Sequence, residues 1–97
     1  MQAPAPHHHL VEDSIFLPVS LRLAKQLLAL VDVYGLQAKD QPTLPVSQGE
    51  LGRMLGVSRE IVARQLAIWR RAGLVEMQRG RITLRDRAAL AAMVGNA

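Results

Sequence analysis

The chain contains 97 residues, 49% of them hydrophobic, which suits one small domain with a modest core and leaves no room for a second. It has no cysteine, so a disulfide framework, a thiolate nucleophile and a cysteine-based zinc or iron–sulfur site are excluded within these residues. Residues 1–52 carry three basic and five acidic side chains (−2), whereas residues 53–97 carry nine arginines and three acidic side chains (+6), so the second half is the candidate surface for a polyanion.

Several classes of protein are disfavoured by what the sequence lacks. No apolar run reaches the length of a membrane span, and the N-terminus lacks the basic-then-apolar order of a signal peptide, which predicts a soluble, cytoplasmic protein. There is no Ser/His/Asp set, metal-ligand cluster or glycine-rich phosphate loop, so we expect a binding protein without a cofactor rather than an enzyme. Ten of the twelve basic residues are arginine, which favours planar contacts with phosphate or guanine, although a GC-rich genome would also enrich arginine.

Residues 1–16 are predicted to be a disordered tail or a purification remnant, and residues 17–97 are predicted to form the domain. The tail contains Pro4, Pro6 and the run His7-His8-His9. Three consecutive histidines can bind a metal ion, but no partner ligand stands near them in the sequence, so they are assigned no role.

Apolar residues at helical spacing predict a first helix from Pro18 to Tyr34, which Gly35 ends. The apolar face is broad enough to cover both a core and part of a partner. After a polar connection over residues 36–43, the run 44–46 is predicted to be a short extended piece. The apolar face of the helix consists of Leu17, Leu21, Leu23, Ala24, Leu27, Leu28, Leu30 and Val31.

Two further helices are predicted by their capping residues. Glu50 stands three residues after Ser47, which is the pattern of a capping box opening a short helix over residues 48–55. Ser58 can cap a second helix over residues 59–72. The turn between them is three to four residues long and contains a glycine, which is the spacing of a helix-turn-helix whose second helix reads the DNA major groove.

The predicted helix over residues 59–72 has two chemically different faces. At about 100° per residue, its arginines, Glu60 and two alanines fall within one arc of about 140°, and most apolar residues fall opposite. An arginine-rich face with small residues along its midline suits close approach to a major groove, although a solvated surface helix is the plain alternative. The first arc holds Arg59, Glu60, Ala63, Arg64, Ala67, Arg70 and Arg71; the second holds Ile61, Val62, Leu66, Ile68, Trp69 and Ala72, and is interrupted by Gln65.

Two short extended runs separated by a turn predict a β-hairpin over residues 75–84. Beyond a helix-turn-helix such a hairpin is a wing, and Arg79 and Arg81 near its tip would flank a DNA backbone; an ordinary polar turn is the alternative. Asp86 can cap a last helix over residues 87–94. The predicted fold class is mainly α with a small β wing: a winged helix-turn-helix of about four helices plus a β-hairpin.

The residues that carry these signals resemble the C-terminal DNA-binding domain of Crp/Fnr transcription regulators, the bacterial class that includes the cyclic-AMP receptor protein. The resemblance covers roughly residues 17–84, and its most specific part is Ser58-Arg59-Glu60 followed by Arg64. It implies sequence-specific binding of double-stranded DNA, with the recognition helix 59–72 in the major groove and the wing 75–84 near the backbone.

The resemblance also implies roles for individual residues. Arg59 and Arg64 would donate to guanine, and Glu60 would accept from cytosine N4; the chemistry agrees, because guanine offers two acceptors and cytosine one donor in the major groove. Glu60 could instead simply favour the positive N-terminus of its helix. Contacts with DNA phosphates are expected from Ser20, Ser47, Gln48, Ser58, Arg70, Arg71, Arg79 and Arg81.

Nothing in the sequence corresponds to the N-terminal effector domain of that family or to its long dimerisation helix. We therefore expect an excised domain, with a natural short protein as the alternative. In the full-length regulator an effector would bind a domain absent here, the protein would be a homodimer, and RNA polymerase would be a further partner. A winged-helix protein-interaction module without DNA binding stays open as the alternative. Such modules more often expose aromatic anchors, and the chain has only Phe16, Tyr34 and Trp69.

Overall fold

The computed structural model describes the backbone of residues 4–95 and the side chains of residues 19–95. This part of the chain forms four helices and one three-stranded antiparallel sheet, which confirms the predicted mainly α winged helix-turn-helix. In chain order the elements are α1 (Pro4–Val33), β1 (Thr43–Leu44), α2 (Gln48–Leu55), α3 (Arg59–Arg71), β2 (Val75–Gln78), β3 (Arg81–Leu84) and α4 (Arg87–Gly95).

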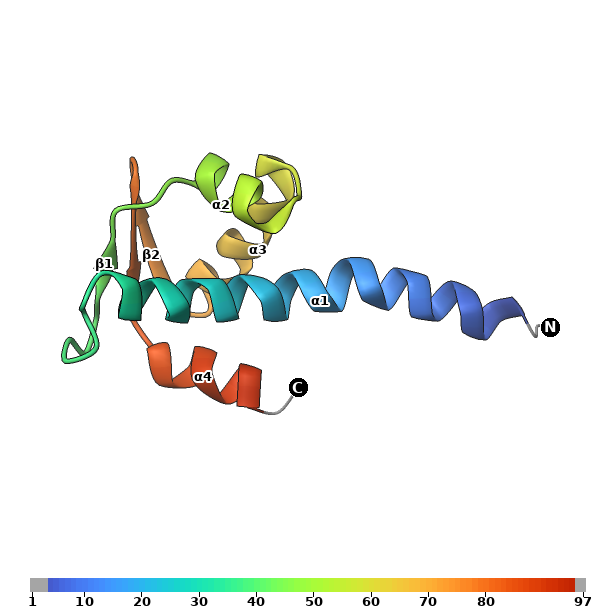
Figure 1. Ribbon diagram of the computed structural model, residues 1–97, viewed down its shortest axis with the longest axis horizontal. Helices are drawn as coiled ribbons and strands as arrows, with labels where there is room; N and C mark the ends of the chain where they lie inside the picture. Colours follow the sequence, from blue (N-terminus) through green and yellow to red (C-terminus); the bar gives the residue numbers. More distant parts are fainter. Residues whose placement is uncertain (1–3, 96–97) are drawn as a thin grey trace.

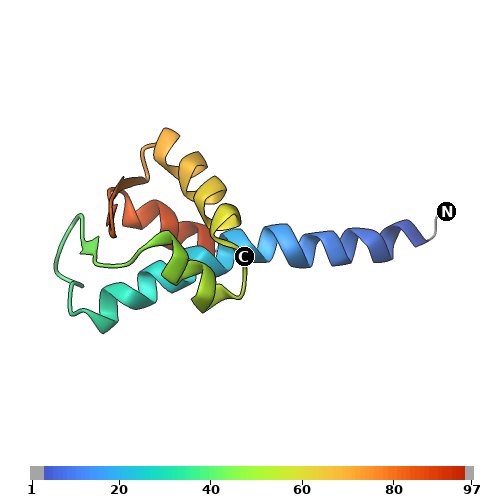
Figure 2. The same ribbon diagram turned by 90° about the horizontal axis from the view of Figure 1, so that it is seen from above.

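The long helix α1 separates two groups of elements. Figure 1 shows α2 and α3 on one side of α1 and α4 on the other, with the sheet at the C-terminal end of α1. The turn between β2 and β3 points to the same side as α2 and α3. Figure 2, seen from that side, shows α2 and α3 next to each other, while the N-terminal part of α1 continues beyond the body. The helix pair and the tip of the hairpin therefore share one face of the molecule.

Helix α1 begins earlier than the apolar pattern predicts. The helix starts at Pro4, whereas the spacing of apolar residues predicts a start at Pro18. Pro4 and Pro6 both lie in the first turn, where proline is tolerated because its missing N–H would have no helical partner there. The helix continues through Pro18 with one backbone hydrogen bond fewer. The division of the chain into a tail over residues 1–16 and a domain over residues 17–97 stays a prediction.

One hydrophobic core joins all seven elements. No polar or charged side chain is buried among residues 19–95, and none of the described helices is both long and apolar enough to span a membrane. Leu28 of the predicted α1 stripe is only partly buried, because α1 turns its 23/27/30 side toward the other elements. The core consists of Leu23, Ala24, Leu27, Leu30, Val31, Leu44, Val46, Leu51, Leu55, Val62, Leu66, Trp69, Val75, Ile82, Leu84 and Leu90.

The turn between α2 and α3 is tight because Gly52 has no side chain. A Cβ atom added at Gly52 would lie 2.8 Å from the carbonyl oxygen of Val57. Gly56 ends α2 in the left-handed conformation with φ +71°, and the N–H of Val57 donates to the carbonyl of Gly52 at 2.9 Å. From α1, the Arg22 guanidinium donates to the carbonyl of Leu55 at the end of α2. The position of α3 relative to α2 is therefore fixed by close backbone contact.

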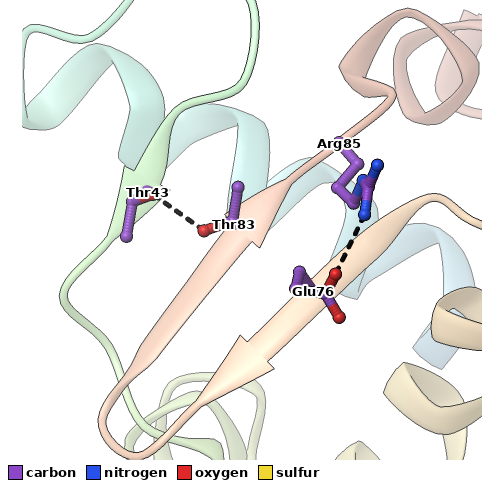
Figure 3. Close-up of polar contacts among 4 residues, drawn as sticks. All are labelled: Thr43, Glu76, Thr83 and Arg85. Atoms are coloured by element: carbon purple, nitrogen blue, oxygen red, sulfur yellow. Dashed lines mark hydrogen bonds and ion pairs between the residues drawn. The ribbon is translucent and has the colours of Figure 1, made fainter.

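The sheet has one strand more than the predicted hairpin. β3 is central, and it pairs antiparallel with both β2 and the two-residue strand β1, which places Thr43 opposite Thr83. The outer face of the sheet is polar: the hydroxyl oxygens of Thr43 and Thr83 lie 2.7 Å apart, and Arg85 Nη1 donates to Glu76 Oε2 at 2.9 Å (Figure 3). Because both members of the ion pair are half exposed, it contributes at most about 1 kcal/mol to the free energy of unfolding.

Candidate nucleic-acid interface

Helix α3 has a buried face and an exposed face, and the boundary between them differs from the predicted one. Val62, Leu66 and Trp69 are buried as predicted. Ile68 and Ala72, which the helical projection assigns to the apolar side, are exposed, Ile68 by 50%. The three buried residues lie within about 60° of one another around the helix, so the core contacts only a narrow strip of it.

The three predicted base-reading residues, Arg59, Glu60 and Arg64, are all exposed on α3. Among the residues whose side chains are described, none of the three takes part in a side-chain hydrogen bond or ion pair. Glu60 lies in the first turn of α3, where the helix dipole favours a negative charge. The charged groups of all three are therefore available to a ligand.

A cleft of about 500 Å³ lies between the wing and the N-terminal ends of α2 and α3. The structure thereby brings together four of the predicted DNA contacts around one cleft, from the start of α2, the start of α3 and the turn of the wing. Arg59 and Arg79 contribute two positive charges to its lining and no acidic residue lines it, so the cleft suits an anionic group. The complete lining is Val46, Ser47, Gln48, Arg59, Met77, Gln78, Arg79, Gly80 and Ile82.

The predicted capping box is present at the start of α2. Ser47 Oγ accepts from the N–H of Glu50 at 3.1 Å, and Glu50 Oε1 accepts from the N–H of Ser47 at 2.8 Å. The bond from the Ser47 backbone is the main reason that the pKa of Glu50 lies below its ordinary value, and the Ser47 hydroxyl and the charge of Arg53 lower this pKa further. Ser47 therefore has a structural role beside the phosphate contact predicted for it.

The other polar residues predicted to contact phosphates differ in how free their polar groups are. Ser58 Oγ caps α3 by accepting from the N–H of Ile61 at 3.2 Å. Gln48 Nε2 donates to Met77 Sδ at 3.4 Å, which ties α2 to the wing. Ser20 lies inside α1 rather than at the start of a helix, so its backbone N–H is used within the helix and only its hydroxyl can contact a phosphate.

The four arginines predicted to contact phosphates are all exposed. Arg70 and Arg71 form the last turn of α3, and Arg79 and Arg81 stand on either side of Gly80 at the tip of the wing. Gly80 has φ +71°, a conformation that favours glycine and makes the short turn between β2 and β3 possible. The predicted phosphate-contacting arginines therefore lie at the two ends of the exposed surface formed by α3 and the wing.

Sequence reasoning missed Met77 and Gln78 as lining residues of the cleft. Strand alternation assigns Met77 to the same face as the buried Val75, which is a usable signal. The sequence does not say which side of the hairpin turns toward α2, because that depends on the pairing of β3 with β1 and on the packing of the sheet against the helices.

The chain shows no candidate metal site in its described part. Among residues 19–95, no group of three or more histidine, aspartate or glutamate side chains is placed to hold a metal ion. The side chains of His7, His8 and His9 lie outside the described residues, so their lack of a role stays a prediction.

Comparison with known proteins adds independent information about this surface. A family model described as the Crp-like helix-turn-helix domain matches residues 21–93. The match includes α2, α3, the whole sheet and most of α4, and hence every predicted DNA contact except Ser20. No curated protein sequence matches the chain at a significant level.

Solved structures of Crp/Fnr regulators share this fold. A protein of the crp/fnr family from Eubacterium rectale is 26% identical, with a TM-score of 0.72 over 91% of this chain and 38% of its own. TTHB099, a CRP-family regulator from Thermus thermophilus, is 25% identical, with a TM-score of 0.65 over 100% of this chain and 57% of its own. TTHA1359, a CRP/FNR-family regulator from the same organism, is 22% identical, with a TM-score of 0.68 over 94% and 47%. The chain therefore spans between 38% and 57% of the length of these regulators.

Proposed function

The chain belongs to the Crp-like helix-turn-helix family, the non-enzymatic DNA-binding domains of Crp/Fnr transcription regulators, and from this premise we propose how it reads DNA. The protein binds double-stranded DNA sequence-specifically, with α3 in the major groove and the wing near the backbone. The observation that carries the proposal is the exposure of Arg59, Glu60 and Arg64 on one helix, without partners among residues 19–95, beside a cationic cleft.

Base reading is assigned to these three residues. A guanidinium group can donate to O6 and N7 of guanine together, and a carboxylate can accept from N4 of cytosine, so the trio suits G·C base pairs. A carboxylate among arginines also opposes nonspecific binding. Its negative charge repels the DNA phosphates on every sequence, and a hydrogen bond from a cytosine amino group compensates only at the correct site. Ala63 and Ala67, which lie between the arginines on the helix surface, allow the backbone of α3 to approach the base edges closely.

Backbone contacts are assigned to the rim of the cleft and to the arginines around it. In this proposal a DNA strand passes the cleft, where it meets Arg79 of the wing and the start of α2. These contacts hold the protein in register on the duplex and carry no sequence information themselves. At the start of α2 the assigned phosphate contacts are Ser47 and Gln48; the others are Ser20, Ser58, Arg70, Arg71 and Arg81.

The proposal extends to the longer regulator that the comparisons suggest. Such a regulator acts in the cytoplasm as a homodimer on a near-palindromic site, with its two recognition helices about 34 to 36 Å apart. RNA polymerase is a further proposed partner, and an effector would bind outside this chain. A single DNA-binding domain loses the linked second binding event, which can raise avidity by about 10² to 10⁴, so we expect weak binding from the domain alone.

Fluorescence anisotropy with labelled duplexes tests this function. The protein is titrated against a palindromic TGTGA-type site, the operator that the family resemblance suggests, and against a scrambled duplex over a series of salt concentrations. We expect tighter binding to the palindrome and a steep salt dependence on both duplexes, because phosphate contacts release counterions.

Two other results would revise the proposal in different ways. Equal and salt-sensitive binding to both duplexes would show a DNA-binding domain with a different operator, which selection from a randomised duplex pool would then identify. No binding to any duplex at low salt would overturn the proposal in favour of a winged-helix protein-interaction module.

A further inference from the structure

Ile68 is the most exposed apolar side chain of α3. Half of its surface is accessible, whereas Val62, Leu66 and Trp69 of the same helix are buried and Ile61 is only partly exposed. Helix geometry places Ile68 next to Arg64, four residues before it, and next to Arg71, three residues after it. Both arginines are exposed. On its other side Ile68 has the uncharged Gln65 and Ala72, so this apolar group lies at the edge of the arginine face of α3.

Isolated exposed apolar residues are common on proteins, and Val33, 73% exposed at the end of α1, is one of them. Ile68 differs from Val33 in its neighbours, because Arg64 and Arg71 place it beside a surface whose positive charge suits a polyanionic ligand. Of the groups that line a major groove, the thymine C5-methyl is the one that an aliphatic side chain contacts favourably.

We propose that Ile68 determines specificity by contacting the methyl group of a thymine in the major groove. The inference rests on the proposed function, since it needs α3 to lie in that groove. Four residues of α-helix rise about 6 Å, and successive base pairs are about 3.4 Å apart, so this thymine lies within about two base pairs of the one contacted by Arg64. Ile68 thereby adds recognition of an A·T pair to the G·C recognition assigned to the trio.

Replacing thymine by deoxyuridine tests the contact directly, because the exchange removes the methyl group and leaves base pairing intact. A half-site is first selected from a randomised duplex pool with the wild-type protein, and each thymine in it is then replaced in turn. Anisotropy titrations compare the wild type with Ile68→Ala, with Val33→Ala as the matched control for loss of an exposed β-branched side chain. Thermal unfolding of each variant verifies that it is folded.

We expect one position near the Arg64 contact at which deoxyuridine weakens wild-type and Val33→Ala binding about fourfold, the value of one buried methylene-sized group. At that position Ile68→Ala should bind both duplexes alike, at about the affinity of the wild type for the uracil duplex. The Ile68 assignment is overturned if Ile68→Ala keeps the full thymine preference, or if no position is sensitive to deoxyuridine although the wild type selects a sequence. If the wild type selects no sequence at all, the proposed function fails first.

Discussion

The turn of the helix-turn-helix and the turn of the wing are built in opposite ways. The turn between α2 and α3 is crowded, because the Cα of Gly52 lies so close to Val57 that a Cβ atom would sit 2.8 Å from its carbonyl oxygen. The turn between β2 and β3 is open: a Cβ atom at Gly80 would meet no heavy atom within 4 Å, and only its φ of +71° favours glycine. The first turn is fixed by close backbone contact with α2, whereas no comparable contact is present at Gly80 in the second.

This difference suits two separate functions of the interface, base readout by α3 and phosphate contact by the wing. Residues of α3 inherit a position determined by buried contacts, which suits the readout of base edges, where a small displacement loses a hydrogen bond. Arginines at the tip of the wing sit on an exposed turn, which suits contact with a phosphate backbone that presents the same charge at every step.

The largest expected effect comes from filling the crowded turn. Gly52→Ala should lower the free energy of unfolding by about 1 to 3 kcal/mol, because backbone atoms of residues 57–59 must move away from the new methyl group. Gly49→Ala is the matched control in the same helix, since its Cβ would have only ordinary contacts at 3.8 Å or more, and it should be neutral or stabilising. Urea unfolding measures both. Equal effects from the two substitutions would contradict the close-packed turn.

Removing a base-reading arginine should change the free energy of specific DNA binding by an amount of similar size. Arg64→Ala is expected to weaken binding to the selected site by about 1 to 3 kcal/mol and to relax the preference at one base pair, while binding to scrambled DNA changes much less. Anisotropy titrations on both duplexes measure the difference. Equal losses on specific and scrambled DNA would remove Arg64 from the base-reading trio.

Removing an arginine from the wing should give a smaller and uniform effect. Arg79→Ala is expected to weaken binding to all sequences alike and to lower the slope of log affinity against log salt by about one, because one phosphate contact is lost. Titration of the selected and scrambled duplexes over a salt series checks this. A selective loss on the specific duplex would mean that the wing reads sequence, and the contrast between the two turns would fail.

The smallest expected effect concerns the capping box at the edge of the cleft. Because the folded pKa of Glu50 lies below its ordinary value, its contribution to stability is fully present above the unfolded carboxyl pKa of about 4.3 and is lost as pH falls through the folded pKa. Glu50→Gln keeps a group that can accept from the Ser47 N–H but cannot ionise. In urea unfolding between pH 3 and 7, the free energy of unfolding should fall less toward low pH for this variant than for the wild type. Identical pH profiles would contradict a stabilising role of the ionised Glu50 in the capping box.

Much of the interface was predictable from local sequence. The start of α2 follows from Ser47 and Glu50, and the start of α3 follows from Ser58, because capping joins residues only three apart. The exposure of Arg59, Glu60 and Arg64 follows from helical periodicity, which also relates residues only a few positions apart. Ile68 was assigned to the wrong face, since periodicity locates the apolar side but not how wide a strip of it the core covers.

The sequence by itself determined the order and type of most elements, the position of the helix-turn-helix and the concentration of positive charge in its second half. These properties depend on interactions between residues a few positions apart, which do not require any particular tertiary arrangement. Only the tertiary structure decided that β1 pairs with β3, that Met77 and Gln78 line the cleft, and that four predicted contacts surround it. These properties depend on contacts between distant segments, which are set by packing around a shared core.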